Sequence, residues 1–258
     1  MLKQFISSFL LAFCAINPLN ATTIFDKHRD RAIPAAIHFP DKQTQCSTTT
    51  QCPVAFISNG YGVPHTEYQF LVELLTQAGY LTVSVGHEIK NDPPLAVSGD
   101  LFKNRSENWQ RGAATLAFLQ QDLAAKYPSY NFKKILLVGH SNGGDISAWY
   151  ATEKPALVDK IITLDHRRVP LPRNPNLPIL SIRASDFPAD KGVLPEANNR
   201  QKHAICVVKI ADAKHNDMTD LGPSWLTQHM TESITRFLDN EAIQTQKTGQ
   251  NNPQPLKG

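Results

Sequence analysis

A serine flanked by glycines follows an apolar segment in the middle of the chain. Residues 135–144 read ILLVGHSNGG, with Ser141 at the centre of a Gly-x-Ser-x-Gly motif, and a helix-compatible segment comes next. A strand that turns sharply through this motif into a helix exposes the serine hydroxyl above a sheet. Small residues are needed at Gly139 and Gly143, because larger side chains would collide with neighbouring strands. The motif therefore predicts Ser141 as the nucleophile of an acyl transfer.

A serine nucleophile needs a general base, and His215 is the candidate. In the chain order Ser, acid, His, the base follows the last strand of the sheet, and His215 follows a predicted strand at residues 204–210. His203 begins that strand and His229 lies in the closing helix, so both are interpreted as surface or packing residues. His140, inside the nucleophile motif, is interpreted as a packing residue.

Two carboxylates downstream of Ser141 could orient the base. Asp165 ends the apolar run at residues 161–164, whereas Asp186 ends the run at residues 180–185 and enters a proline-containing loop. The acid has to accept a hydrogen bond from His215 and stabilise the imidazolium, so it should be shielded from solvent. The need for shielding favours Asp165 and keeps Asp186 as the alternative.

The oxyanion formed by nucleophilic attack needs preorganised N–H donors. One comes from the residue after the nucleophile, Asn142, and the second from the loop after an earlier strand. Residues 54–62 read VAFISNGYG, which makes Tyr61 the second donor. The glycines of this segment alone indicate only a turn, but together with the nucleophile motif they favour an oxyanion loop.

Apolar segments with strand and helix periodicity alternate from residue 35 to residue 238, which is typical of a mostly parallel α/β sheet flanked by helices. Strands are expected at 35–39, 54–58, 81–85, 134–138, 160–164, 179–183 and 204–210, and helices at 67–79, 107–127 and 224–238. Residues 22–240 are predicted to form one domain, because no repeat or linker divides them. The tail at residues 241–258 is polar and is expected to be disordered.

Composition excludes several function classes. The chain has 26 Lys and Arg against 23 Asp and Glu, a net charge of +3 that is too small to indicate nucleic-acid binding. The one long apolar run, residues 5–16, follows Lys3 and ends in small and turn residues. This order predicts a signal peptide at residues 1–21 and export to a periplasm or the exterior, with no transmembrane segment once the leader is removed.

The cysteine pattern is consistent with folding in an oxidising compartment. Cys46 and Cys52 flank a short polar stretch between two predicted strands and are expected to form a disulfide after export. Cys14 leaves with the leader, and Cys206 lies in an apolar run as a buried thiol. No Cys-x-x-Cys or His-x-x-x-His spacing occurs, so no metal site is predicted.

With these motifs in place, the sequence resembles the α/β-hydrolase superfamily, and within it the platelet-activating factor acetylhydrolase and dienelactone-hydrolase-like branch. The likeness spans roughly residues 27–238 and is most specific at the nucleophile motif and the oxyanion loop. Besides that motif, it is carried by residues 29–34, 58–62 and 83–87 and by Leu164-Asp165 together with His215-Asn216-Asp217.

The resemblance implies hydrolysis of acyl esters without a cofactor, with Ser141 as nucleophile, His215 as base, and Tyr61 and Asn142 as oxyanion donors. Most α/β-hydrolases place the acid after the later strand, which favours Asp186. The acetylhydrolase-like branch places it after the earlier one, in a Leu-Asp pair followed closely by Pro.

Leu164-Asp165 with Pro170 matches this second pattern, so Asp165 is the predicted acid. Two departures concern the acyl pocket. The family usually has His where this chain has Asn59, and an aromatic residue where it has Asn142. Phospholipid specificity is therefore not implied.

The predicted substrate is a small-molecule or lipid-like ester with a short or accessible acyl group. Only residues 165–178 separate the strands where other hydrolases insert a lid, so we expect no large lid domain and an open site. An arginine-rich stretch in this connection could bind a carboxylate or phosphate, or could simply be solvated. Amidase, peptidase or thioesterase activity with the same triad remains an alternative, as does a non-catalytic binding protein on the same scaffold.

Overall fold

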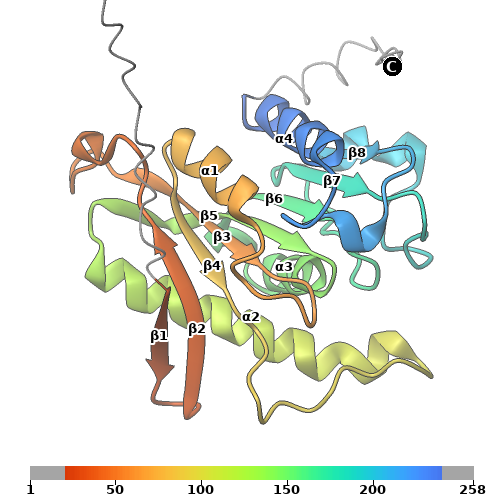
Figure 1. Ribbon diagram of the computed structural model, residues 1–258, viewed down its shortest axis with the longest axis horizontal. Helices are drawn as coiled ribbons and strands as arrows, with labels where there is room; N and C mark the ends of the chain where they lie inside the picture. Colours follow the sequence, from red (N-terminus) through yellow and green to blue (C-terminus); the bar gives the residue numbers. More distant parts are fainter. Residues whose placement is uncertain (1–20, 240–258) are drawn as a thin grey trace, which may run out of the picture.

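The computed structural model describes residues 21–239, which form an eight-stranded sheet flanked by helices (Figure 1). The predicted leader, apart from Ala21, and the predicted tail lie outside the described residues. In chain order the strands are β1 (Ala21–Asp26), β2 (Arg31–His38), β3 (Cys52–Ser58), β4 (Leu81–Val85), β5 (Tyr130–His140), β6 (Val158–Leu164), β7 (Ile179–Arg183) and β8 (Ile205–Lys209).

The strands lie side by side in the order β1-β2-β4-β3-β5-β6-β7-β8. All pairs from β4 to β8 are parallel, whereas β1 and β2 pair antiparallel at one edge of the sheet. Every residue of β4 and β7 is buried, including the polar residues Thr82, Ser84 and Ser181, as expected for strands that are covered by helices on both faces. Because the parallel strands share one direction, their carboxyl ends meet at one edge of the sheet, where ligand sites of such folds lie.

Helices cover both faces of the sheet. The long helices are α1 (Gln69–Gln77), α2 (Leu101–Lys126), α3 (Asn142–Glu153) and α4 (Ser224–Leu238). Apolar side chains of α2 and α3 belong to one core cluster, and those of α1 and α4 belong to a second cluster on the other face. Short 3-10 helices are Gln43–Gln45, Pro155–Leu157, Ala197–Asn199, Gln201–His203 and His215–Asp217. Figure 1 shows β1 and β2 at one edge of this layered arrangement and β8 at the opposite edge.

The predicted alternation of strands and helices is confirmed, although β2 and β5 each begin four residues before the predicted start. Two differences are larger. Strand β1 was not predicted, because only Ile24 and Asp26 of its six residues are buried and it therefore lacks a hydrophobic pattern. Helix α2 begins at Leu101 rather than at residue 107, because the Asp100 side chain accepts the Lys103 N–H at 3.1 Å and caps the helix there. The connection between β6 and β7 contains no helix, so the expectation of no large lid domain is also confirmed.

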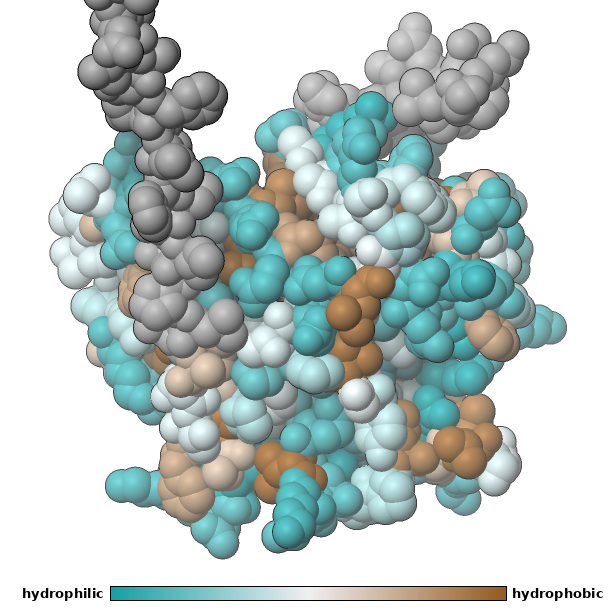
Figure 2. Space-filling model, viewed as in Figure 1, coloured by the Kyte–Doolittle hydropathy of each residue, from teal (hydrophilic) through white to brown (hydrophobic). Residues whose placement is uncertain are grey.

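Among residues 21–239, no helix is both long and apolar enough to cross a bilayer. On the face shown in Figure 2, hydrophobic residues form separate small patches among hydrophilic ones. Small dispersed patches of this kind are ordinary for a protein surface.

The structure contains the predicted disulfide between Cys46 and Cys52. It joins the loop after β2 to the first residue of β3, and both half-buried cysteines pack against the core cluster of α2 and α3. The third described cysteine, Cys206 on β8, has a free thiol whose pKa is raised by burial. The bridge therefore anchors the strand that leads to the oxyanion loop.

Removing this bridge should lower stability modestly. The two cysteines have a sequence separation of 6. In the chain-entropy model, closing this loop lowers the entropy of the unfolded chain and so raises the free energy of unfolding by about 2 kcal/mol. We expect the double variant Cys46→Ser, Cys52→Ser to lose about this free energy of unfolding in urea titrations, and Cys206→Ser to leave the bridge intact. If peptide mapping of unreduced protein from an oxidising compartment finds Cys46 and Cys52 both alkylatable, the predicted bridge is wrong.

Candidate active site

Ser141 lies at the turn between β5 and α3. Its backbone adopts φ 53° and ψ −120°, a left-handed conformation that is strained for a residue with a side chain. The turn is held because the Ser141 N–H donates to the carbonyl of Leu164 at 2.9 Å. A Cβ atom on Gly143 would lie 2.1 Å from the Ser58 carbonyl oxygen, and one on Gly139 would lie 2.3 Å from the Gly143 carbonyl oxygen. The glycines of the motif thus permit the close packing that creates the turn.

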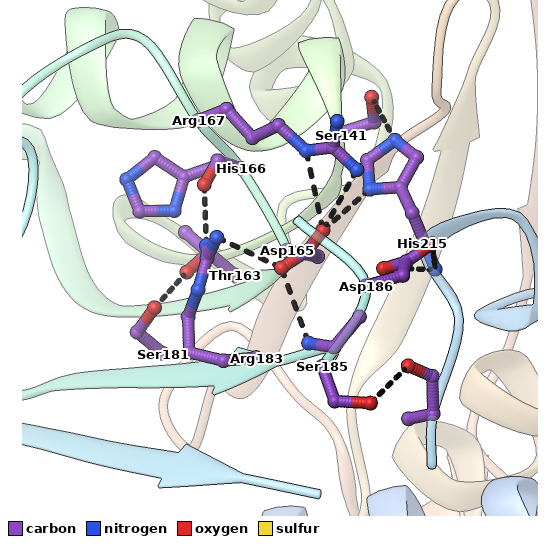
Figure 3. Close-up of polar contacts among 12 residues, drawn as sticks. Ser141, Thr163, Asp165, His166, Arg167, Ser181, Arg183, Ser185, Asp186 and His215 are labelled. Carbon is purple, nitrogen blue, oxygen red and sulfur yellow. Dashed lines mark hydrogen bonds and ion pairs between the residues drawn. The ribbon is translucent and has the colours of Figure 1, made fainter. Parts of the chain in front are cut away.

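The imidazole of His215 lies between Ser141 and Asp165 (Figure 3). Its Nδ1 atom is 2.6 Å from Oδ2 of Asp165, and its Nε2 atom is 2.9 Å from Oγ of Ser141. Because an ionised carboxylate can only accept, this arrangement places the ring proton on Nδ1 and leaves Nε2 to accept from the serine hydroxyl. The three residues follow β5, β6 and β8, so the topology brings their side chains together at one edge of the sheet.

Asp165 is completely buried and is surrounded by donors. Besides the His215 ring, its carboxylate accepts from the Ala184 N–H at 3.1 Å and forms ion pairs with Arg183 at 2.8 Å and Arg167 at 3.2 Å. Burial by itself raises the pKa of Asp165. The hydrogen bond from His215 and the positive charge of Arg183 outweigh that effect, so its pKa is below the usual value. Asp165 is therefore held as a carboxylate.

The alternative acid, Asp186, contacts His215 in a different way. Its exposed carboxylate accepts the backbone N–H of His215, at 3.0 Å from each oxygen, and makes no contact with the imidazole. Asp186 thus anchors the loop that carries the histidine, whereas Asp165 contacts the ring.

The two expected oxyanion donors come from the serine turn and from the loop after β3. Asn142 is the first residue of α3, and Tyr61 lies in the loop after β3. Neither backbone N–H donates a hydrogen bond to another described residue, so both are free to bind an incoming oxygen. A Cβ atom on Gly60 would lie 3.4 Å from Cβ of Ser141, which shows how closely the loop approaches the serine.

A buried chain of hydrogen bonds connects the loop, the turn and the histidine. The Gly60 N–H donates to the Tyr68 hydroxyl at 3.0 Å, and that hydroxyl lies 2.9 Å from Nδ1 of His140. Nε2 of His140 lies 3.0 Å from the His215 carbonyl oxygen, so it carries the ring proton and the Tyr68 hydroxyl donates to Nδ1. Burial lowers the pKa of His140 to about 3, which keeps it neutral. Sequence reasoning assigned only packing to His140 and missed Tyr68, which no motif marks.

The arginines of the β6–β7 connection are already engaged by the protein. Arg167 binds Asp165 and lies 4.3 Å from the centre of the Phe187 ring, Arg168 pairs with Asp190, and Arg173 donates to the Gly192 carbonyl at 2.9 Å. No cluster of three or more His, Cys, Asp or Glu suited to a metal ion occurs within residues 21–239.

Comparison with known proteins identifies the fold. No protein-family model matches the sequence, and no curated protein matches it. Solved structures do match. Est1E from Butyrivibrio proteoclasticus has a TM-score of 0.56 and 14% sequence identity, and the match covers 86% of this chain and 98% of that chain. A dienelactone hydrolase from Anabaena variabilis has a TM-score of 0.54 and 15% identity, with 84% of this chain and 98% of that chain covered. The fold is that of the α/β-hydrolases. A third similar structure is the butyrate-bound esterase Est2 of Thermogutta terrifontis. It has a TM-score of 0.61 and 11% sequence identity, and the match covers 87% of this chain and 95% of that chain. The predicted α/β-hydrolase fold is thereby confirmed.

The hydrogen-bond chain through Tyr68 should affect the reactivity of Ser141. We expect Tyr68→Phe to slow modification of Ser141 by a fluorophosphonate about tenfold, because the Gly60 N–H and His140 lose their shared partner and the oxyanion loop shifts. The second-order rate of labelling measures this effect.

Tyr150→Phe is the matched control, because it removes another buried tyrosine hydroxyl, which donates to Oε1 of Gln120 on α2. It should lower the melting temperature without changing the labelling rate. Equal labelling rates for Tyr68→Phe and the wild type would show that the chain has no influence on the serine.

Proposed function

We propose that this protein is a serine hydrolase that cleaves carboxylic esters through an acyl-enzyme, with Ser141, His215 and Asp165 as its catalytic triad. The observation that carries this proposal is a pair of hydrogen bonds: His215 Nδ1–H donates to Asp165 at 2.6 Å, and the Ser141 hydroxyl donates to His215 Nε2 at 2.9 Å. An acid, a base and a serine in this relation can activate the hydroxyl for attack on a carbonyl carbon.

In this mechanism, Oγ of Ser141 attacks the ester carbonyl while Nε2 of His215 takes its proton. The negative charge that develops on the carbonyl oxygen is stabilised by the N–H groups of Tyr61 and Asn142. The imidazolium is stabilised by Asp165 and then donates its proton to the leaving alkoxide. Water, deprotonated by His215, attacks the acyl-enzyme and releases the carboxylic acid and free serine.

Short or accessible acyl groups fit this site best. The β6–β7 connection contributes no helix that could cover the serine, and Ser141 itself is partly exposed. Enclosure of a long aliphatic chain would need a larger apolar lining than such an open edge supplies. The similar structure of Thermogutta terrifontis Est2 with butyrate supports a short acyl group as the first substrate to test.

Export is part of the proposal. Residues 1–21 have the order of a signal peptide, and the disulfide between Cys46 and Cys52 suits an oxidising compartment. The mature hydrolase domain would then comprise residues 22–240, a start that retains nearly all of β1.

Loss of the nucleophile or base should abolish ester turnover. Ser141→Ala and His215→Ala should each reduce kcat on 4-nitrophenyl butanoate by several orders of magnitude, because each removes an essential part of one acyl-transfer unit. Fluorophosphonate labelling followed by peptide mapping should modify Ser141 in the wild type and no residue in Ser141→Ala. Wild-type turnover in either variant would contradict the triad. Matching amide and thioester substrates would show whether esters are preferred.

Substitution of the two candidate acids, Asp165 and Asp186, should have clearly different effects on kcat. Asp165→Asn should lower kcat by about three to four orders of magnitude, because an amide can neither fix the Nδ1–H tautomer of His215 nor stabilise the imidazolium. Asp186→Asn keeps an oxygen that can accept the His215 N–H, so we expect less than about a tenfold loss.

Melting temperatures of both variants must accompany the kinetics, because Asp165→Asn leaves Arg183 without its buried partner. The reverse order of effects, with Asp186 essential and Asp165 dispensable in folded protein, would transfer the acid role to Asp186.

A further inference from the structure

A carboxylate without a cationic partner lies beside the oxyanion loop. Glu88 follows β4 and is partly buried. Its Oε2 atom accepts from Nδ2 of Asn59 at 3.2 Å, and its Oε1 atom accepts from Nδ2 of Asn142 at 3.4 Å. No Lys, Arg or His among the described residues forms an ion pair with it. Burial and, to a lesser extent, the charge of Asp92 raise its pKa.

The two amides have shorter hydrogen bonds elsewhere, so holding them is not the main task of Glu88. Nδ2 of Asn59 donates to the Val63 carbonyl at 2.6 Å. Nδ2 of Asn142 donates to Asn108 at 2.8 Å, and Oδ1 of Asn142 accepts the indole N–H of Trp109 at 2.9 Å. A carboxylate can accept about four hydrogen bonds, whereas Glu88 receives two long ones from these side chains and one from its own backbone N–H. Glu88 therefore has capacity for a further donor.

Nearby cations are neutralised by another residue. Arg31 forms an ion pair with Asp92 at 2.7 Å, and Arg111 forms one with the same carboxylate at 3.2 Å. Asp92 itself is the charged group that opposes ionisation of Glu88. The negative charge of Glu88 is thus uncompensated by the protein on the side of the site where an oxyanion would form.

The order of the strands places Glu88 on the acyl side of the proposed reaction. Ser141 follows β5, with β3 and β4 on one side of it and β6, β7 and β8 on the other. His215, after β8, must donate a proton to the leaving alcohol, so the alcohol lies on that side. The acyl chain then extends in the opposite direction, toward Glu88 after β4.

We propose that Glu88 selects acyl groups that carry a positively charged amino group, with which it forms a charge-assisted hydrogen bond. This inference rests on the proposed ester hydrolysis and names the class of its substrate. With a neutral acyl group, the charge of Glu88 opposes the developing oxyanion. An ammonium group on the acyl chain neutralises the charge of Glu88 and donates a hydrogen bond to its carboxylate.

Two esters of equal length and the same leaving group test the proposal. In 4-nitrophenyl 3-aminopropanoate an ammonium group takes the place of the terminal methyl group of 4-nitrophenyl butanoate. We expect Glu88→Gln to lower kcat/KM for the aminoacyl ester about tenfold and to raise it for the butanoate, each relative to wild type at neutral pH. Comparison of variant with wild type cancels the different intrinsic reactivities of the two esters.

The opposite signs distinguish substrate selection from a structural role. Glu73→Gln is the matched control, because Glu73 is an exposed carboxylate on α1 and should leave both values unchanged. If Glu88→Gln changes both esters by the same factor, the inference is wrong while ester hydrolysis stands. If the wild type shows no Ser141-dependent turnover of either ester, the proposed function fails and the inference fails with it.

A second measurement needs no variant and covers the case in which Glu88→Gln does not fold. Butylammonium and 1-pentanol have similar lengths and differ in charge. Butylammonium should inhibit butanoate hydrolysis by the wild type at a concentration about tenfold lower than 1-pentanol, because only the cation pairs with Glu88. Equal inhibition by the two molecules would overturn the inference.

Discussion

The buried charge of Asp165 is the constraint on which the carboxyl edge of the sheet depends. An ionised carboxylate with no exposure to solvent loses several kcal/mol of hydration, which the protein has to offset with donors and opposite charges. Arg183 at the end of β7, the N–H of Ala184, Arg167 and the ring of His215 supply them. Because these groups come from different strand ends, satisfying one carboxylate fixes β6, β7 and the loop after β8 relative to one another.

The same constraint gives the arginines of the β6–β7 connection a structural task. Arg183 also donates to the carbonyl of His166, and Arg167 is placed between Asp165 and the ring of Phe187. Guanidinium groups suit this role because they stay charged and present several donors in one plane. In the basic stretch that could have bound a ligand anion, Arg167 thereby binds the internal anion Asp165.

The two sides of Ser141 differ in how completely their polar groups are satisfied. On the side of His215, the donors around Asp165 leave little freedom, and a buried chain that starts at Gly60 and runs through Tyr68 and His140 ends at the His215 carbonyl. On the side of β4, Glu88 receives two long hydrogen bonds from side chains and one from its own backbone N–H, and it forms no ion pair with a described residue. A fully satisfied network holds its members in one geometry, whereas an incompletely satisfied carboxylate is suited to a ligand.

The sequence alone determined the α/β-hydrolase fold and pointed to Ser141 and His215. Both conclusions rest on signals that short stretches of sequence carry: the motif of a strained turn and the alternation of strand and helix patterns. The sequence favoured Asp165 over Asp186 by the argument of shielding but left both open, since both follow strands of the same sheet. Only the tertiary structure assigned each aspartate to a different atom of His215. It also brought Tyr68 to His140 and Glu88 to Asn142, because contacts between residues far apart in the chain depend on strand order and leave no local pattern.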